Sequence, residues 1–346
     1  MRSESRDWGI RVLARRLAPW FSWAYLASLL GILALLWFIG ERSWFGLVLL
    51  YLPRAPLALP LLVTVPLILV SGSFYLIVTQ LLCLWLVLFP LMGLKPLSRA
   101  QPSSQESSFR VLSYNVWFAN RGADAIRAEV ERANAQIVLL QAVNTRAYAV
   151  LEGEPFVHWH TLRLARLAIA SQFPISEHQL FEDASGGPFA RFTLETPLGA
   201  IDLYSVHTIS PRGALSRFQM FRQWVPPESD RLDASLNTQL REQQIRRLVE
   251  AAHKSKHPVL IAGDINLPVL SRLEREYLRD FRDAFDDAGS GFGYTFPTIA
   301  RIGPWMRIDR ILAGPGLRFL RFFVGGGEGS DHSPVVADVA AASIAR

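Results

Sequence analysis

The chain has 346 residues, a net charge of +6 and a single cysteine, Cys83. One cysteine excludes a disulfide framework and a cysteine-rich zinc site. Residues 1–108 hold 9 Lys and Arg against 4 Asp and Glu, which leaves 27 basic and 26 acidic residues for the rest of the chain. A domain that follows a nucleic-acid backbone usually has a clear basic excess. The near-neutral composition of residues 109–346 argues against such a domain.

Residues 1–97 predict an all-α membrane unit of about three transmembrane helices. Trp20 to Ile39 and Phe74 to Leu94 are uncharged apolar stretches, each long enough to cross a bilayer. Between them, residues 44–70 are apolar but interrupted by four prolines. This stretch is either one kinked span or a partial span with an interfacial piece. A cleaved signal peptide is not expected, because its apolar core would be shorter and no further spans would follow.

The charges beside these stretches predict the topology. Only Glu41 and Arg42 follow the first stretch, whereas five arginines precede it: Arg2, Arg6, Arg11, Arg15 and Arg16. The positive-inside rule therefore places the N-terminus in the cytoplasm. Three spans would put the C-terminal domain outside the cytoplasm, as a multi-pass protein of a cell inner membrane, whereas two or four would keep it inside. Residues 98–108 are polar without apolar periodicity and predict a flexible linker.

Residues 109–346 predict an α/β domain that follows this linker. Helical spacing of apolar residues predicts helices at 124–134 and 236–252. Strands are predicted at eight apolar runs: 109–116, 137–140, 167–171, 190–194, 201–207, 259–262, 307–312 and 335–339. Alternation of buried strands with helices indicates an α/β arrangement.

Polar strings end or follow five of these apolar runs. They are Ser113-Tyr114-Asn115, Val206-His207-Thr208, Gly263-Asp264-Ile265-Asn266, Arg307-Ile308-Asp309-Arg310 and Ser330-Asp331-His332. Each predicts polar chemistry at the tip of a buried strand. Together they supply oxygens for a metal, a base for water and a cation for phosphate, which is the set that metal-dependent hydrolysis of a phosphate ester needs.

The order of these strings, together with Gly-Tyr-Thr-Phe-Pro at 293–297, resembles the endonuclease/exonuclease/phosphatase superfamily over residues 109–340. The resemblance is to the deoxyribonuclease-I-like fold, in its bacterial membrane-anchored type with N-terminal transmembrane helices. It implies a four-layer sandwich of two face-packed mixed β-sheets flanked by helices. It also implies activity that depends on Mg²⁺ or Mn²⁺, as in the family's nucleases, inositol-phosphate phosphatases and sphingomyelinases.

The resemblance assigns a metal and a water-activating set. Asn115 looks like the asparagine that supports the metal, although a strand-end Asn can also simply cap a turn. Asp331 is expected to reach the metal. Asp264 resembles the group that orients or deprotonates the attacking water, and Asn266, two residues on, is expected to hydrogen-bond the phosphate from the same face.

A second set is expected to bind the phosphate and stabilise its charge. His332 resembles the histidine that does this in the family. Asp309 is the expected carboxylate that orients His332 and raises its pKa, although Asp309 and Asp331 could exchange roles. His207 would be a further phosphate ligand, its alternative being a histidine buried for packing.

One position departs from the family's pattern. Where Ile-Val-Leu-Leu-Gln at 137–141 ends, the family has a glutamate that ligates magnesium, and this chain has Ala142. Removing the main carboxylate should cost much of the metal affinity and most of the rate, because Mg²⁺ often has only one or two protein carboxylates. Glu152 and Glu154 lie ten or more residues further on and are poor substitutes.

Three explanations compete for the alanine. It is an engineered inactivation, or a natural change in a binding module, or the sign of a site rebuilt around Asn115, Asp264 and Asp331 with more metal-bound water. The first is preferred, because clustered buried carboxylates repel and a domain drifting from catalysis would be expected to lose more than one of them.

Two observations favour a membrane lipid as substrate. The linker keeps the domain close to the last apolar stretch, and Leu215 to Trp224 interleaves aromatic with basic residues, as in an interfacial helix, or else forms a lid. The leading interpretation is a membrane-anchored, Mg²⁺-dependent phosphohydrolase of a phosphodiester, with a lipid headgroup or lipid-linked substrate favoured and with activity lost through Ala142. The alternatives are an extracytoplasmic nuclease acting on nucleic acid, a catalytically silent binding module, and a protein whose membrane unit is its functional part.

Overall fold

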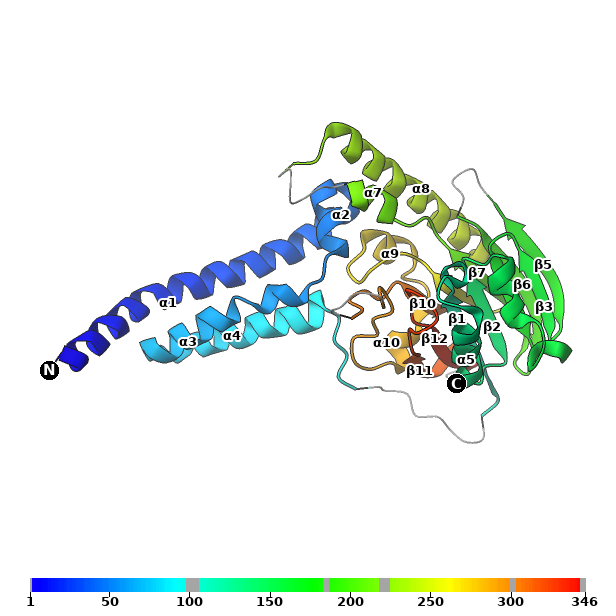
Figure 1. Cartoon of the computed structure of the whole chain (residues 1–346), viewed down its shortest axis with the longest axis horizontal. Helices are drawn as coiled ribbons and strands as arrows, with labels where there is room; N and C mark the ends of the chain where they lie inside the picture. The colour runs from blue at the N-terminus through cyan, green and yellow to red at the C-terminus, as the bar shows by residue number, and fades with distance from the viewer. Residues whose placement is uncertain (1, 98–105, 183–186, 218–224, 299–302, 343–346) are drawn as a thin grey trace. The chain divides into compact units, whose positions relative to one another are not determined.

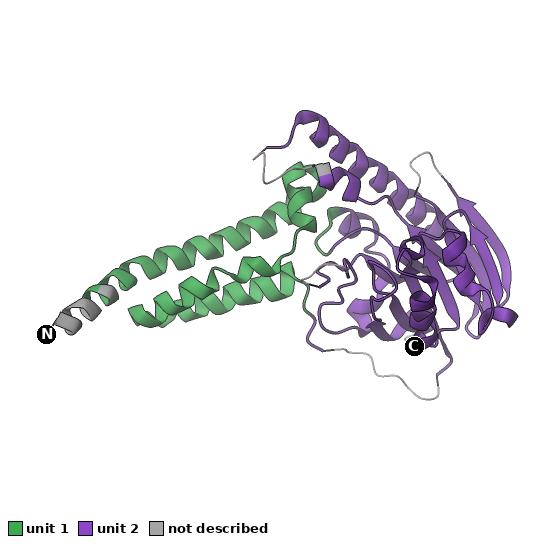
Figure 2. Cartoon of the chain, in the orientation of Figure 1, with its two compact units in different colours: residues 1–94, 269–272 green, residues 95–268, 273–346 purple. Residues whose placement is uncertain are grey.

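The computed structural model describes residues 2–97, 106–182, 187–217, 225–298 and 303–342, which form two compact units (Figures 1 and 2). The first unit consists of residues 1–94 together with residues 269–272. The second consists of residues 95–268 and 273–346.

The first unit is helical. Helix α1 (Arg2–Ala34) continues through a π-helical turn (Leu35–Ile39) and a 3₁₀ turn (Gly40–Arg42). Helix α2 (Trp44–Tyr51) is followed by a 3₁₀ turn (Ala55–Ala58) and by α3 (Leu61–Ser71), and α4 (Tyr75–Leu86) runs into a π-helical turn (Val87–Leu91). Ala18, Ile68 and Leu76 form a small buried cluster where α1, α3 and α4 pack.

Within the described residues, only Arg11–Arg42 is a helix long and apolar enough to cross a membrane, with a mean hydropathy of 2.0. Trp44–Tyr51 and Ala55–Ser71 would be a second span only if this pair, bent by 88°, counts as one. The prolines explain the bend, since each removes a backbone donor and clashes with the preceding turn. The last apolar helix, Tyr75–Leu91, is shorter.

Two mixed six-stranded sheets build the second unit, as the family resemblance implies (Figure 1). The first has the order β11-β12-β1-β2-β4-β3. Its strands are β1 (Ser108–Asn115), β2 (Ile137–Gln141), β3 (His160–Leu164), β4 (Leu167–Ser171), β11 (Leu317–Val324) and β12 (Val335–Ala341). Strands β1 and β2 are parallel and the other pairs are antiparallel.

The second sheet has the order β5-β6-β7-β8-β10-β9. Its strands are β5 (Ile175–Phe181), β6 (Phe189–Thr196), β7 (Gly199–His207), β8 (Val259–Asp264), β9 (Arg282–Asp283) and β10 (Asp309–Ala313). Strands β7 and β8 are parallel and the other pairs are antiparallel. Each sheet thus has one parallel pair at its centre, and both parallel pairs lead towards the polar strings.

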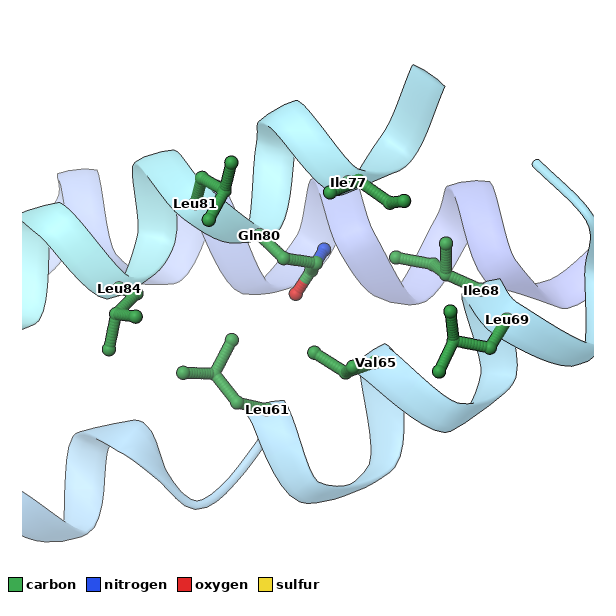
Figure 3. Close-up of a pocket in the computed structure, with 8 residues that line it drawn as sticks. All are labelled: Leu61, Val65, Ile68, Leu69, Ile77, Gln80, Leu81 and Leu84. Carbon is green, nitrogen blue, oxygen red and sulfur yellow. The ribbon is translucent and has the colours of Figure 1, made fainter. Parts of the chain in front are cut away.

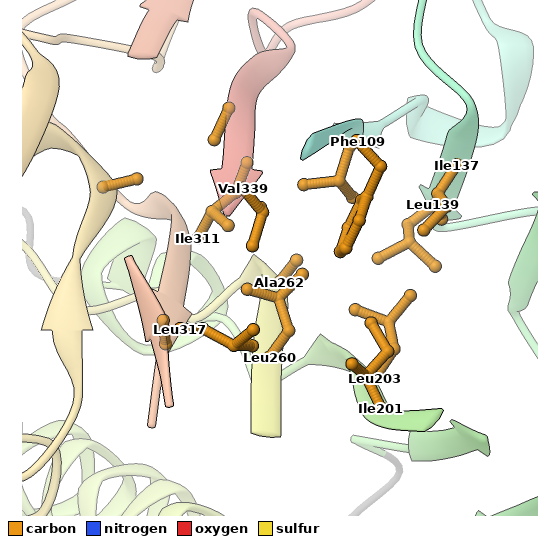
Figure 4. Close-up of a cluster of buried hydrophobic side chains, with 14 of the residues drawn as sticks. Phe109, Ile137, Leu139, Ile201, Leu203, Leu260, Ala262, Ile311, Leu317 and Val339 are labelled. Atoms are coloured by element: carbon orange, nitrogen blue, oxygen red, sulfur yellow. The ribbon is translucent and has the colours of Figure 1, made fainter. Parts of the chain in front are cut away.

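Alternating apolar side chains divide the domain into layers. The core between the sheets contains Phe109, Leu139, Leu203, Leu260 and Ile311 (Figure 4). Neighbouring residues of the same strands point outward, where the first sheet packs on α5 (Ala123–Ala133) and the second on α8 (Glu228–His253). Such period-two alternation is what buries both faces of a central strand.

Shorter helices complete the domain: α6 (Thr145–Tyr148), α7 (Arg212–Arg217), α9 (Arg272–Tyr277) and α10 (Ala284–Ala288). Helix α8 begins eight residues before the predicted start of its helix. The predicted interfacial segment 215–224 lies largely outside the described residues, as does most of the predicted linker.

Candidate active site

Register places three of the expected residues in one row across the second sheet. His207 at the end of β7 lies opposite Asp264 at the end of β8, and Asp264 lies opposite Asp309 at the start of β10. Residues directly opposite each other in neighbouring strands project from the same face of a sheet. The three side chains therefore gather at one end of this sheet.

Gly263 allows this row to form. Its φ is +152°, and a Cβ atom at this position would lie 1.9 Å from the carbonyl oxygen of Val206 on the neighbouring strand. No side chain fits there, so glycine is required for the close approach of β7 and β8. The residue that follows is Asp264.

Asn115 joins this row from the other sheet. It ends β1, and its Nδ2 donates to Asp264 Oδ2 at 2.9 Å, while its Oδ1 accepts from the backbone nitrogen of Trp117 at 3.1 Å. Asp264 Oδ1 accepts from the backbone nitrogen of Asn266 at 3.0 Å. Both oxygens of the Asp264 carboxylate are thus held by donors, which fixes its orientation.

The turn after Asn115 has an unusual backbone. Trp117, Phe118 and Ala119 have φ values of +43°, +57° and +56°. Successive left-handed residues other than glycine are strained, and such strain is found most often at functional sites. This turn supplies the backbone donor that orients Asn115.

His332 completes the group from the loop before β12. Its Nδ1 lies 2.9 Å from Asp309 Oδ2, and its ring centroid lies 4.6 Å from that of Phe296. Its backbone nitrogen donates to Ser330 Oγ at 3.3 Å, and Ser330 Oγ donates to the carbonyl of Asn115 at 2.6 Å. The ring is therefore held by a carboxylate, an aromatic face and a serine bridge to β1. The Nε2 atom faces Asp264 Oδ2 at 3.7 Å.

Burial and mutual charge separate the pKa values of these groups. Burial raises the pKa of Asp264 to about 7, with Asp309 adding to the rise and His332 opposing it. Burial opposes the charged form of His332, but Asp309 and Asp264 outweigh it and raise its pKa to about 9. Desolvation and the neighbouring His332 lower the pKa of His207 to about 4. These shifts favour the cationic form of His332 and the neutral form of His207 at neutral pH, and they disfavour the ionised form of Asp264.

Arg212 also reaches this site, and the sequence analysis missed it. At the start of α7, its guanidinium lies 2.7 Å from Asp331 Oδ2 and 5.0 Å from the ring centroid of Phe296. About half of the Arg212 side chain is exposed, whereas Asp331 is buried. No motif surrounds Arg212 in the sequence, since Ser-Pro-Arg at 210–212 is an ordinary turn.

Asn266 and Ala142 both have a left-handed backbone. Asn266 has a left-handed φ of +53° and donates from Nδ2 to the carbonyl of Thr208 at 3.1 Å. Ala142 lies one residue after Gln141, which pairs in register with Asn115, and it is buried with a φ of +53°. Ala142 thus retains a strained, site-adjacent backbone without the carboxylate.

The residues expected to hold the metal differ in the ligand atoms that they offer. Ala142 has no ligand atom, Asn115 Oδ1 accepts from the backbone, and Asp331 pairs with Arg212. Ligand atoms of Asp264, Asp309 and His332 lie within 4.8 Å of one another. Asp309 Oδ1 is buried and has no partner in the described part of the chain. Mg²⁺ and Mn²⁺ prefer carboxylate oxygens, and this cluster has two carboxylates.

Comparisons with known proteins agree with this architecture. The model of the endonuclease/exonuclease/phosphatase family matches residues 112–332. An endonuclease/exonuclease/phosphatase family protein from Bacteroides thetaiotaomicron is 15% identical, with a TM-score of 0.50 over 68% of this chain and 96% of its own.

Two D. rerio TDP2 structures are similar in the same way. The one humanized by 14 mutations is 16% identical, with a TM-score of 0.51 over 67% of this chain and 98% of its own. The one complexed with a single-strand DNA product is 16% identical, with a TM-score of 0.50 over 68% of this chain and 99% of its own. No curated protein matches the chain. At such identities the structures establish the fold alone. The family match spans more than half of the sequence, and the chain therefore belongs to the endonuclease/exonuclease/phosphatase family.

Proposed function

We propose that the second unit is a phosphodiesterase domain that acts on a lipid headgroup or a lipid-linked substrate beside a membrane. The observation that carries this proposal is the convergence of Asp264, Asp309, His332 and Asn115 at one point between two sheets. Asp264 and Asp309 are each at most 2% exposed. Burying charged groups is costly unless they are paired or bind a ligand, and perturbed pKa values in one cluster are typical of functional sites.

The groups divide into a base, an acid and phosphate ligands. Asp264, whose pKa is about 7, takes a proton from water as the water oxygen bonds to phosphorus. The bond from phosphorus to the ester oxygen breaks, and the leaving oxygen takes a proton from the His332 imidazolium, whose pKa is about 9. Asp309 holds the other ring nitrogen and keeps the imidazolium charged. His207 and Arg212 lie beside them and are proposed to bind the phosphate oxygens.

A divalent cation, Mg²⁺ or Mn²⁺, would be held by Asp309, whose buried Oδ1 has no partner among the described residues, and this leaves Asp264 free to act as the base. When bound, it would stabilise the negative charge that grows on phosphate oxygens. With Ala142 in place of a glutamate, the site has fewer carboxylates than the family's site, so we propose that the chain binds the cation weakly and hydrolyses its substrate slowly or not at all.

The first unit supports anchoring in a membrane. Large apolar side chains are exposed along it, among them Trp20 at 78%, Phe38 at 73% and Leu62 at 73%. Apolar surface of this extent marks a membrane or protein contact. We therefore propose a multi-pass protein of the inner membrane, with α1, the bent pair and α4 as its membrane segments and with the catalytic domain outside the cytoplasm. The catalytic domain lies outside the cytoplasm if all three segments cross the membrane.

A nuclease is the second candidate. The similar D. rerio TDP2 structure holds a single-strand DNA product, and the fold alone does not distinguish a nucleotide from a lipid phosphodiester. The charge balance of residues 109–346 weakens this candidate. A steep loss of binding with added salt would strengthen it.

The test compares the chain with its Ala142→Glu variant, with Mg²⁺ or Mn²⁺, on bis-p-nitrophenyl phosphate, phospholipid vesicles and single-stranded DNA. His332→Gln in the glutamate background is the control for contaminating activity. Hydrolysis by the glutamate variant alone, fastest on phospholipid, is the expected result. Preference for DNA would favour the nuclease, and activity in both forms would show a rebuilt metal site. Silence in both folded forms would refute the hydrolase and leave a binding module.

A further inference from the structure

The two units differ in the binding features that their described residues offer. In the first unit, a groove between α3 and α4 is lined by seven aliphatic side chains and Gln80 (Figure 3). No charged side chain is among its described lining residues, so the groove offers nothing that would select one ligand. In the second unit, the turn between β3 and β4 presents an exposed arginine, Arg166, next to the candidate active site.

An aromatic ring and a strained turn hold Arg166. Its Cζ lies 5.6 Å from the ring centroid of Phe118, which belongs to the turn that follows Asn115. Arginine stacks on aromatic faces, and such a contact positions the guanidinium before a ligand arrives. Ala165, directly before Arg166, has a left-handed φ of +52°. Left-handed residues other than glycine are strained, and they are found most often at functional sites.

Strand register places this turn at the same end of the sandwich as the site. Asn115 pairs with Gln141 on β2, and Gln141 pairs with Leu167 on β4, so the three residues lie in one row across the first sheet. Arg166 comes directly before Leu167, and its carbonyl accepts from the backbone nitrogen of Val143 at 2.9 Å. Because neighbouring strands are about 5 Å apart, the backbone of Arg166 lies roughly 10 Å from that of Asn115. An arginine side chain can bridge most of this distance.

The charge of Arg166 reaches the position proposed for the phosphate. Strand β4 packs against β7 across the core of the sandwich, and His207 ends β7. Burial and His332 lower the pKa of His207 most, and the charge of Arg166 lowers it further. Arg166 and His207 therefore lie close enough to act on one ligand.

Arg166 differs in its pairing from the two cations of the site described above. His332 pairs with Asp309, and Arg212 pairs with Asp331. Arg166 forms no ion pair with a carboxylate in the part of the chain that the structure describes. A guanidinium can bind a phosphate group through two parallel hydrogen bonds. A guanidinium that is positioned but unpaired beside a phosphate site suits a further anionic group of the ligand.

We propose that Arg166 binds a second phosphate group of the substrate, beside the phosphodiester that is cleaved. The inference rests on the proposed function and narrows its substrate class. The phosphodiester carries a further phosphate, which belongs either to a lipid headgroup or to a neighbouring nucleotide. The membrane anchoring proposed above favours the lipid headgroup.

Calorimetric titration of the full chain in detergent micelles tests this inference without turnover. Two pairs of probes differ by one phosphate group. Glycerol 1,3-bisphosphate against glycerol 3-phosphate represents a lipid headgroup, and thymidine 3′,5′-bisphosphate against thymidine 5′-phosphate represents a nucleic acid. We expect glycerol 1,3-bisphosphate to bind about tenfold more tightly than glycerol 3-phosphate, as one charged hydrogen bond would give. A gain in the thymidine pair alone would keep the role of Arg166 and identify a nucleic acid as the source of the second phosphate.

A matched pair of variants locates the second phosphate. Arg166→Gln should remove the gain. Arg163→Gln is the control on the same hairpin, because Arg163 is also exposed and stacked, with its Cζ 6.0 Å from the ring centroid of Tyr148, but donates to Thr145 Oγ1 at 3.5 Å; it should keep the full gain. No gain in either pair of probes, a gain that survives Arg166→Gln, or an equal loss in both variants overturns the inference. If the native chain shows the gain but the Ala142→Glu variant hydrolyses nothing, the proposed hydrolase fails and the second phosphate site stands.

Discussion

The Asp309→Asn substitution tests the pairing of Asp309 with His332, because it keeps the size of the Asp309 side chain and removes its charge. In the native protein Asp309 Oδ2 lies 2.9 Å from His332 Nδ1, and both residues are buried. The interval between the ordinary pKa of 6.5 and the value of about 9 corresponds to about 3 kcal/mol in favour of the imidazolium. Without the Asp309 charge, burial lowers the pKa and only more distant carboxylates oppose it.

We expect the pKa of His332 to fall to 6.5 or below in the variant. At pH 8 the protonated fraction would drop from about nine-tenths to about one-thirtieth, so the proposed acid would be lost. Histidine-selective ¹⁵N labelling of the full chain in micelles measures this directly, with His332→Gln to assign the resonance among the 7 histidines. No turnover is needed, so the result does not depend on Ala142.

Asp331→Asn is the matched control. Its carboxylate lies 3.9 Å from His332 Nε2 and is already paired with Arg212. We expect this variant to lower the pKa of His332 by less than about one unit. A pKa that stays above about 8 in Asp309→Asn, or an equal fall in both variants, would refute the assignment of Asp309 as the charge that holds the imidazolium.

Three further predictions concern catalysis and stability. In the Ala142→Glu variant, activity should rise with pH near 7 as Asp264 loses its proton and fall near 9 as His332 loses its own; a flat profile between pH 6 and 10 would contradict these roles. Arg212→Ala in that variant should raise KM about tenfold with little change in kcat, since it removes one charged hydrogen bond to phosphate; an unchanged KM would place Arg212 outside the substrate site. Asp283→Ala leaves two buried arginines without their shared carboxylate and should lower the free energy of unfolding by about 3–5 kcal/mol in urea titrations. The exposed Asp280→Ala is its control and should change stability little.

The strands that the sequence predicted are those whose two faces are both buried. Strands β2, β4 and β8 are buried throughout and stand out as apolar runs. The strands that the sequence analysis missed are β3, β5, β9 and β11, and these are the four edges of the two sheets. Strand β5 has an exposed centre with polar residues, so no apolar period marks it. Edge strands pair on one side only and commonly carry such polar residues.

The residues of the candidate site were likewise predictable only where they adjoin apolar strands. Asn115, Asp264 and Asp309 end or begin central strands, so apolar runs beside them disclosed their positions. Arg212 reaches the site only because α7 and the loop after β7 fold back towards it, and no local pattern encodes that path. The pairing of Asp331 with Arg212 was hidden for the same reason. Motifs predicted which residues carry chemistry, and the fold was needed to show which of them touch.

The bond between Asn115 and Asp264 crosses from one sheet to the other. Neither sheet alone contains a complete set of groups, so the site comes into existence only when the sandwich closes over Leu139, Leu203 and Leu260. A folding intermediate with a single sheet formed would have no reactive centre. Apolar substitutions far from the site that shift one sheet against the other by a fraction of an ångström would therefore change the geometry of the catalytic groups. Substitutions that alter activity are thus expected in the core between the sheets as well as around the polar residues.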